Sequence, residues 1–203
     1  MRLGLLSPAE GNLDDLRQGA DFLLKSKKAH RVIYLGADEC FDEMIEAWGS
    51  ELVHGDASDR AIWTRSLDAC VSASPGEIDA YLEHENQRSA LRVFESLVGD
   101  ATRSVEMITG KLAVMIYDKA HFDEEDMLPA TLLVFGKSPN YVVKQVGHRW
   151  FLCPGPFSEA GVMLLESTEQ GLAMSLYTKD GDEVSRQILQ TTQNTKFNIQ
   201  SAD

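Results

Sequence analysis

Residues 2–13 read Arg2-Leu3-Gly4-Leu5-Leu6-Ser7-Pro8-Ala9-Glu10-Gly11-Asn12-Leu13. A short apolar run ends at Ser7, a turn follows, and Asn12 is of a residue type that caps the start of helices. The pattern therefore predicts a strand, a loop and a helix in immediate succession. Ligands of open α/β sheets bind where such strands end, so the loop from Ser7 to Gly11 is the first place to expect a site.

The same pattern recurs along the first half of the chain. A strand is predicted at 31–36, followed by a helix whose apolar residues fall at 41–48. A third strand is predicted at 51–55, followed by a helical segment that contains Ile62, Trp63 and Leu67. Three strands that each lead into a helix indicate a parallel sheet with right-handed crossovers.

The second half has the alternation typical of strands. The segment Ser74-Pro75-Gly76-Glu77 first predicts a helix start, and we expect that helix to run from Pro75 to about Val98. Strands are then predicted at 104–108, 112–117, 131–136, 141–146, 149–153, 161–166, 171–177 and 183–190. The chain is thus expected to adopt an α/β (α+β) fold, a four-layer αββα sandwich of two mixed β-sheets flanked by helices.

Composition limits the function classes. We expect one domain over 1–190, with a helical insertion at about 60–100 and a polar tail at 191–203. The net charge of −13, from 32 acidic and 19 basic residues, argues against nucleic-acid binding. The sequence has neither a long apolar run nor a signal-peptide pattern, which predicts a cytoplasmic location and no membrane contact. The three cysteines, Cys40, Cys70 and Cys153, form no disulfide framework or zinc motif.

Short motifs follow several predicted strands: Pro8-Ala9-Glu10-Gly11-Asn12-Leu13, Gly36-Ala37, Gly55-Asp56-Ala57-Ser58-Asp59, Tyr117-Asp118, Gly136-Lys137-Ser138-Pro139 and Cys153-Pro154-Gly155-Pro156. In order and flanking strands, the chain from about Met1 to Glu166 resembles the calcineurin-like metallophosphoesterases, above all their small bacterial and archaeal phosphodiesterase branch. That resemblance implies the two-sheet fold predicted above.

The resemblance also implies where a metal centre would stand. The family holds two divalent cations, about 3.5–4 Å apart, with imidazoles and carboxylates at strand ends. The corresponding positions here are Pro8, Glu10, Ala37, Asp56, Tyr117, Lys137 and Pro139. Only Glu10 and Asp56 keep groups that readily bind metal. We therefore expect no catalytic residues and no metal or other cofactor.

Alternatives remain open at this point. Glu10, Asp38, Asp56 and His121 could hold a single hard cation, one Mn or Mg ion. Lys137 could neutralise Glu10 and Asp56 if these two carboxylates converge, or it could be an ordinary solvated residue. Without a metal, Lys137 and the backbone around Gly11 and Gly155 could instead receive an anion.

The functional expectation is a catalytically inactive metallophosphoesterase-fold protein that acts as a protein–protein interaction scaffold or regulatory subunit. The alternative is a divalent-cation-dependent phosphoesterase with an altered, single-metal site. A protein partner is expected, and the aromatic residues proposed for its interface are Trp63, Tyr141, Trp150 and Phe157. The default expectation for each of these four is a place in the core.

Overall fold

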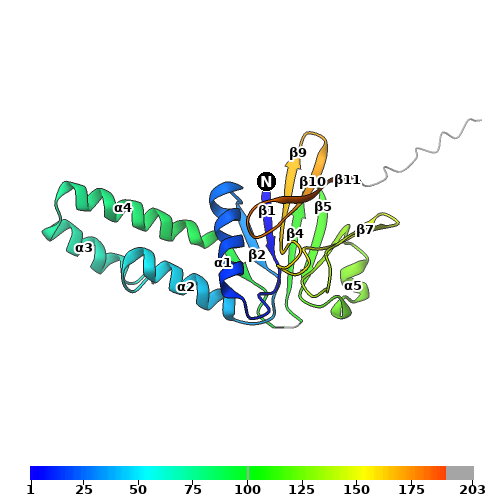
Figure 1. Cartoon of the computed structure of the whole chain (residues 1–203), viewed down its shortest axis with the longest axis horizontal. Helices are drawn as coiled ribbons and strands as arrows, with labels where there is room; N and C mark the ends of the chain where they lie inside the picture. The colour runs from blue at the N-terminus through cyan, green and yellow to red at the C-terminus, as the bar shows by residue number, and fades with distance from the viewer. Residues whose placement is uncertain (100, 191–203) are drawn as a thin grey trace, which may run out of the picture.

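The computed structural model describes residues 1–99 and 101–190, so the predicted tail at 191–203 lies outside the described residues. Two mixed β-sheets pack face to face (Figure 1). The first has six strands in the order β11-β10-β9-β1-β2-β3, with bounds β1 Arg2–Leu6, β2 Arg31–Tyr34, β3 Phe94–Ser96, β9 Val162–Thr168, β10 Gly171–Tyr177 and β11 Glu183–Leu189. The strands β1, β2 and β3 are parallel, and β9 is antiparallel to β1.

The second sheet has five strands in the order β4-β5-β6-β8-β7. Their bounds are β4 Arg103–Ile108, β5 Lys111–Ile116, β6 Leu132–Phe135, β7 Val142–Val146 and β8 Arg149–Cys153. The strands β5, β6 and β8 are parallel, and the hairpins β4–β5 and β7–β8 supply the antiparallel edges. The predicted hairpins at 104–117 and 141–153 are confirmed.

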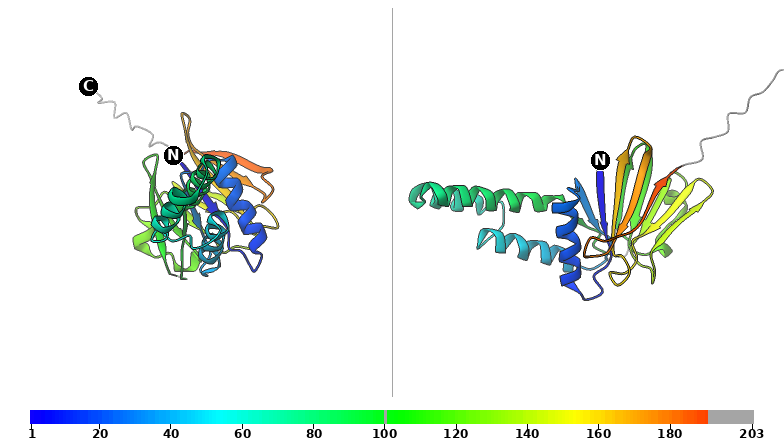
Figure 2. Two further views of the ribbon diagram at one scale, coloured as in Figure 1. Left: turned by 90° about the vertical axis from the view of Figure 1, so that its left-hand side faces the viewer. Right: turned by 45° about the horizontal axis from the view of Figure 1, so that its top comes forward.

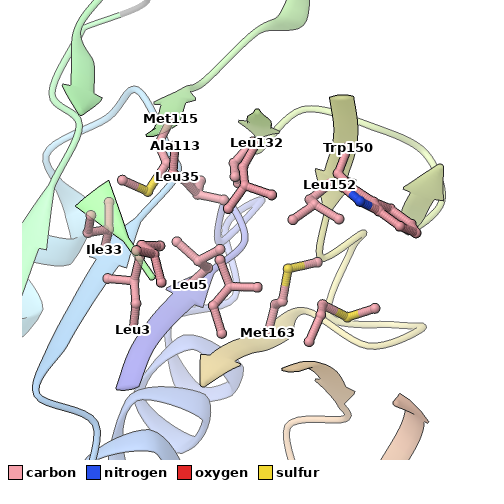
Figure 3. Packing of buried hydrophobic residues seen from close by; sticks show 14 of the residues in the cluster. Leu3, Leu5, Ile33, Leu35, Ala113, Met115, Leu132, Trp150, Leu152 and Met163 are labelled. Carbon is pink, nitrogen blue, oxygen red and sulfur yellow. The ribbon is translucent and has the colours of Figure 1, made fainter. Parts of the chain in front are cut away.

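Apolar side chains fill the space between the sheets. Leu5 and Ile33 of the first sheet lie opposite Met115 and Leu152 of the second, as Figure 3 shows. Alternate residues of the same strands, such as Val32 and Leu6, face the other way and form a second core under the helices. This alternation follows from the two-residue repeat of a β-strand and gives the first sheet two buried faces.

Helices cover the outer faces. Along the first sheet lie α1 (Leu13–Asp21), which continues as a π-helical turn η1 (Phe22–Ser26), and α2 (Cys40–Val53). The Asn12 side chain accepts the amide of Asp15 (3.2 Å), which confirms the predicted helix cap. The second sheet is covered more thinly, by η3 (Lys119–His121) and α5 (Glu124–Met127). The predicted class, two mixed sheets flanked by helices, is confirmed.

The prediction of a strand at 51–55 was wrong. Residues 51–53 form the last turn of α2, and His54, directly after the helix, has a left-handed conformation. Leu52 is half-buried and continues the helical spacing of Phe41, Met44 and Trp48, so it belongs to the apolar face of α2 that packs in the second core. The segment 51–55 therefore does not end at the sheet edge.

The third parallel strand is β3, which the sequence had assigned to the end of a long helix. The helix α4 (Pro75–Ala90) stops early, and a short turn η2 (Leu91–Val93) leads into the strand. Phe94 pairs with Val32 of β2, and its ring meets those of Phe41 and Trp48. Burial of Phe94 under α2 thus decides in favour of a strand.

The helices α3 (Ile62–Ser72) and α4 form an antiparallel hairpin that projects from the helical side of the first sheet (Figures 1 and 2). We call residues 62–90 the arm. Glu85 of α4 accepts from Arg65 (2.7 Å) and Arg88 (2.8 Å), and the hydroxyls of Ser66 and Tyr81 are 2.6 Å apart. The arm is thus joined by polar contacts at its centre. Among the described residues, none of the helices combines the length and apolar character that membrane crossing requires.

Candidate functional site

The carboxyl ends of the parallel strands of both sheets meet at one edge, which we call the strand-exit edge. Ser7, directly after β1, is fully buried, and its hydroxyl donates to the carbonyl of Gly155 in the loop after β8. Its amide donates to the carbonyl of Gly161 (3.0 Å). Ser7 therefore ties the first sheet to the second.

Tyr34, the last residue of β2, organises the loops that follow β1 and β2. Its hydroxyl accepts from the amide of Ala9 (3.0 Å) and donates to Asp38 Oδ1 (3.1 Å). The residue is fully buried, and this burial raises the pKa of its phenol well above the ordinary value. The hydroxyl thus stays protonated and acts as a fixed link between the two loops.

Asp38 is held by its own neighbourhood. Besides the Tyr34 hydroxyl, Asp38 Oδ1 accepts the amide of Cys40 (3.3 Å) at the start of α2. Burial and the hydrogen bond with Asp38 raise the pKa of the Cys40 thiol to about 11. The carboxylate of Asp38 is therefore engaged in hydrogen bonds with Tyr34 and Cys40. The Cys40 thiol remains protonated at neutral pH.

Glycines permit close backbone approaches at this edge, and one of these approaches joins the two sheets. A Cβ added at Gly136, after β6, would collide with the carbonyl oxygen of Leu35, after β2. A Cβ at Gly155 (φ +75°) would collide with the backbone of Tyr141. The Gly136 amide donates to the carbonyl of Tyr117 (3.0 Å). Backbone therefore fills much of the space between the strand ends.

One ion pair lies on the second sheet's side of this edge. Lys137 Nζ donates to Asp118 Oδ2 (2.7 Å), and Asp118 also accepts the amide of Ala120 (3.0 Å). The backbone hydrogen bond from Ala120, followed by the bond from Lys137, lowers the pKa of Asp118. Tyr117 lies beneath, with its ring centre 5.6 Å from Lys137 Nζ. Lys137, for which neutralisation of Glu10 and Asp56 was one open alternative, thus pairs with Asp118.

Glu10 lies in the exposed loop between β1 and α1, at a positive φ of 49°. It borders a hollow of about 180 Å³, whose lining includes Pro8, Asp15 and Phe157. The two carboxylates give this hollow an acidic rim, and Lys179 binds Asp15 from outside (2.5 Å). Glu10 therefore faces solvent, away from the contacts that close the strand-exit edge.

Asp56 lies elsewhere, contrary to the motif expected at 55–59. It follows α2, which runs away from the sheets (Figure 1). Its side chain accepts the amide of Ser58 (2.8 Å), which lowers its pKa, and its carbonyl accepts from Arg65 of the arm. An α-helix rises about 1.5 Å per residue, so α2 puts roughly 20 Å between Asp38 and Asp56.

The other expected positions are occupied as follows. Ala37 accepts the amide of Gly99 through its carbonyl (3.0 Å), and Pro139 lies in the loop after β6. His121 ends the short η3 turn, and its carbonyl accepts from Arg103 (3.0 Å). Neither Ala37 nor Pro139 has a side chain able to bind metal.

These residues do not fit the metal centre that the resemblance implies. Within 1–99 and 101–190, His, Cys, Asp and Glu side chains form no group of three or more able to hold a metal ion. The four residues considered for a single cation, Glu10, Asp38, Asp56 and His121, are thus not brought together. Asp38 and Asp118 are each engaged in hydrogen bonds with the protein.

The four aromatic candidates for an interface have different surroundings. Trp63 is 80% exposed on α3, and Tyr141 is exposed before β7. Trp150 is a core residue between the sheets, and Phe157 packs partly buried beside α1. Only Trp63 and Tyr141 are therefore available to a partner.

The sequence and the structure were compared with those of known proteins. No family model and no curated protein matches the sequence. A predicted phosphoesterase from Streptococcus pneumoniae TIGR4 shares 12% identity, with a TM-score of 0.48 over 90% of this chain and 91% of that one. An archaeal phosphodiesterase shares 11% identity, with a TM-score of 0.48 over 87% of this chain and 99% of that one.

Vacuolar protein sorting 29 from Cryptosporidium parvum shares 14% identity, with a TM-score of 0.49 over 92% of this chain and 96% of that one. At these identities and TM-scores the likeness assigns neither a family to this chain nor a role to any of its residues.

Sequence reasoning missed Tyr34 and the exposed face of the arm. Tyr34 was read only as part of a strand, because its partner, the Ala9 amide, is a backbone group far away in the sequence. The arm did carry a signal, since Trp63, Leu67 and Val71 repeat every four residues. A stripe at that spacing usually marks a buried helix face, so its exposure could not be inferred.

Proposed function

We propose that this protein is a protein-binding scaffold whose docking surface is the arm, and that it does not turn over phosphoesters. The observation that carries the proposal is the exposure of three large apolar side chains along α3. Trp63 is 80%, Leu67 64% and Val71 79% exposed to solvent.

These side chains make α3 an unusual helix. None of its residues is buried, although its apolar residues repeat with the period of a packed helix. Soluble proteins rarely keep a contiguous apolar patch in water, and patches of this kind mark sites of association. Tryptophan is also enriched among the residues that contribute most to binding energy. Association with a partner would remove this surface from water.

The strand-exit edge supports the second half of the proposal. Its carboxylates Asp38 and Asp118 bind Tyr34 and Lys137, and Pro8, Ala37 and Pro139 stand where the resemblance would put metal ligands. A hydrolytic site needs donors that converge on a substrate with space between them. The groups present here instead connect the loops to one another.

Affinity capture with matched variants tests the docking half. The arm variant, Leu67→Gln with Val71→Gln, replaces two of the three exposed apolar side chains of α3 with a residue that favours a helix. The control, Val105→Gln with Met107→Gln, changes two exposed apolar residues of β4. A partner identified by mass spectrometry and retested in pure form should bind the wild type and the control, and lose at least about tenfold in affinity for the arm variant. Equal binding by all three would contradict the proposal.

A turnover assay tests the other half. The purified protein should hydrolyse bis(p-nitrophenyl) phosphate no faster than buffer, with Mn²⁺ or Mg²⁺ present. Metal-dependent hydrolysis that is abolished by Asp38→Ala would instead favour the single-cation phosphoesterase. Full folding of that variant, checked by circular dichroism, would make the loss specific.

A further inference from the structure

We propose that the partner of the arm is an amphipathic helix whose apolar face is flanked by Lys and Arg side chains. This inference rests on the proposed docking function and adds to it the chemistry of the partner. It follows from three features of the arm: the direction of its apolar residues, the charges beside them and the pairing of its arginines.

The apolar residues of α3 point to one side of the hairpin. Arg65 and Ser66 face α4, because they bind Glu85 and Tyr81. Each residue of an α-helix is turned by about 100° from the one before it. Leu67 is therefore turned away from α4 toward one side.

The apolar residues of α4 point to that same side. Tyr81 faces α3, and Leu82 follows it by one residue, with Ile78 one turn earlier. Because the two helices run in opposite directions, the turn from Ser66 to Leu67 and the turn from Tyr81 to Leu82 lead to one side of the hairpin. Both Ile78 and Leu82 are exposed. Two helices thus present one apolar surface, which suits a third helix laid along them.

Acidic residues line the outer borders of this surface. Asp68 follows Leu67 on α3, whereas Asp79 follows Ile78 and Glu83 follows Leu82 on α4. Within the part of the chain that the structure describes, none of the three carboxylates forms an ion pair. An apolar surface with an unneutralised acidic border is complementary to an apolar stripe with a basic border.

The arm's own arginines do not cancel that border. Both Arg65 and Arg88 point inward to Glu85, and Arg88 also binds Asp59 (3.0 Å). The sequence contains no lysine between residues 29 and 110. The charge offered to a partner beside Leu67, Ile78 and Leu82 is therefore negative.

The same charge disfavours other occupants. A second copy of this chain would bring an identical acidic border against the first, and like charges across an interface oppose association. Anionic lipid surfaces and nucleic-acid phosphates are repelled in the same way. A helix with Lys and Arg beside its apolar stripe would cover the apolar surface and place positive charges next to its acidic border.

Trp63 provides the readout for a test with defined probes. It is highly exposed, whereas Trp48 and Trp150 are only 6% and 4% exposed. Two synthetic 21-residue helical peptides would share one leucine stripe, flanked by Lys in one and by Glu in the other. The lysine peptide should shift Trp63 emission to the blue in a saturable way, and its affinity should fall as salt is raised.

Variants locate the interaction. The arm variant Leu67→Gln with Val71→Gln should weaken binding of the lysine peptide at least about tenfold, and the β4 control should not change it. Asp79→Asn with Glu83→Gln should weaken it by about threefold to tenfold and flatten the salt dependence. Equal binding after these two charge substitutions would overturn the inference.

The remaining outcomes are also decisive. If the glutamate peptide binds as well as the lysine peptide, the charge border does not select the partner, and the inference fails while the docking function stands. If neither peptide shifts the emission, the inference fails too, and affinity capture still decides the proposed function. Self-association in sedimentation equilibrium that disappears in the arm variant would assign the surface to a second copy and overturn the inference.

Discussion

The strand-exit edge and the arm contain similar residue types, but these side chains bind one another at the edge and are exposed to solvent on the arm. At the edge, a tyrosine, a lysine and carboxylates meet one another: Tyr34 binds Asp38, and Lys137 binds Asp118. On the arm, a tryptophan and carboxylates meet solvent: Trp63 is exposed and Asp79 has no ion pair among the described residues. Side chains left exposed to solvent, rather than charged side chains as such, therefore distinguish the proposed docking surface from the strand-exit edge.

The two regions also differ in how closely they are packed. Backbone of the two sheets meets at Gly136 and Leu35, where even one added carbon would collide. Gly76 at the start of α4 has open space at the same position. The same type of substitution should therefore have different effects on stability in the two regions.

The largest difference is expected between two tryptophans. Trp48 of α2 packs against Phe94 and Arg17, so Trp48→Ala should lower the free energy of unfolding by about 3–5 kcal/mol. Trp63→Ala should change it by no more than about 0.5 kcal/mol, because the side chain is exposed. Urea denaturation followed by circular dichroism measures both. A comparable loss in the two variants would mean that the arm face is packed in solution.

A smaller difference is expected between two glycines. The Cβ of Gly136→Ala would collide with the carbonyl of Leu35, and the required backbone shift should cost about 1–3 kcal/mol. Gly76→Ala meets nothing within 4 Å and lies in a helix, so it should leave stability unchanged or raise it by up to about 1 kcal/mol. Thermal unfolding compares the two. An unchanged melting temperature for Gly136→Ala would show that the sheets do not meet there.

The sequence sufficed for most of the first sheet and for the hairpins of the second. The cap at Asn12 and the apolar runs at 162–165 and 172–177 are local signals, and local signals are what a single sequence contains. The third strand was misplaced because Leu52 and Val53 form a short apolar run. Such a run fits either a strand or the end of a helix. Burial of the apolar face of α2, to which Leu52 belongs, decided in favour of a helix.

The candidate site was less predictable than the fold. Asp56 was expected at a strand end only because residues 51–55 were predicted to form a strand. In the structure these residues end α2, and the Asp56 carbonyl binds Arg65 of the arm. The Lys137–Asp118 pair joins two loops whose proximity depends on the pairing of β5 with β6. Such contacts between distant segments have no local signature.

Two tyrosines offer the next test. Tyr34→Phe leaves the Ala9 amide without its acceptor in a buried place, so it should cost about 1–3 kcal/mol. Tyr81→Phe removes one hydroxyl contact, with Ser66, on the half-exposed arm and should cost about 0.5 kcal/mol. Equilibrium denaturation at neutral pH distinguishes them. Equal costs would show that the Tyr34 hydroxyl is not a buried link.

The smallest effect concerns pH. The pKa of Asp118 is lower in the folded protein than its ordinary value of 3.8, so its contribution to stability is present above that value and is lost as pH falls through the lower folded pKa. Asp118→Asn should therefore destabilise the protein at pH 7 by up to about 1 kcal/mol and have a smaller effect near pH 3. Urea denaturation at the two pH values measures this. A larger effect at pH 3 would contradict the sign.

Hydrogen exchange with and without the lysine-flanked peptide tests the central claim most directly, namely that the arm rather than the strand-exit edge receives a partner. The account predicts added protection confined to residues 62–90, and none over 7–12, 36–40 and 136–141. Protection at these strand-end loops, with residues 62–90 unchanged, would contradict it.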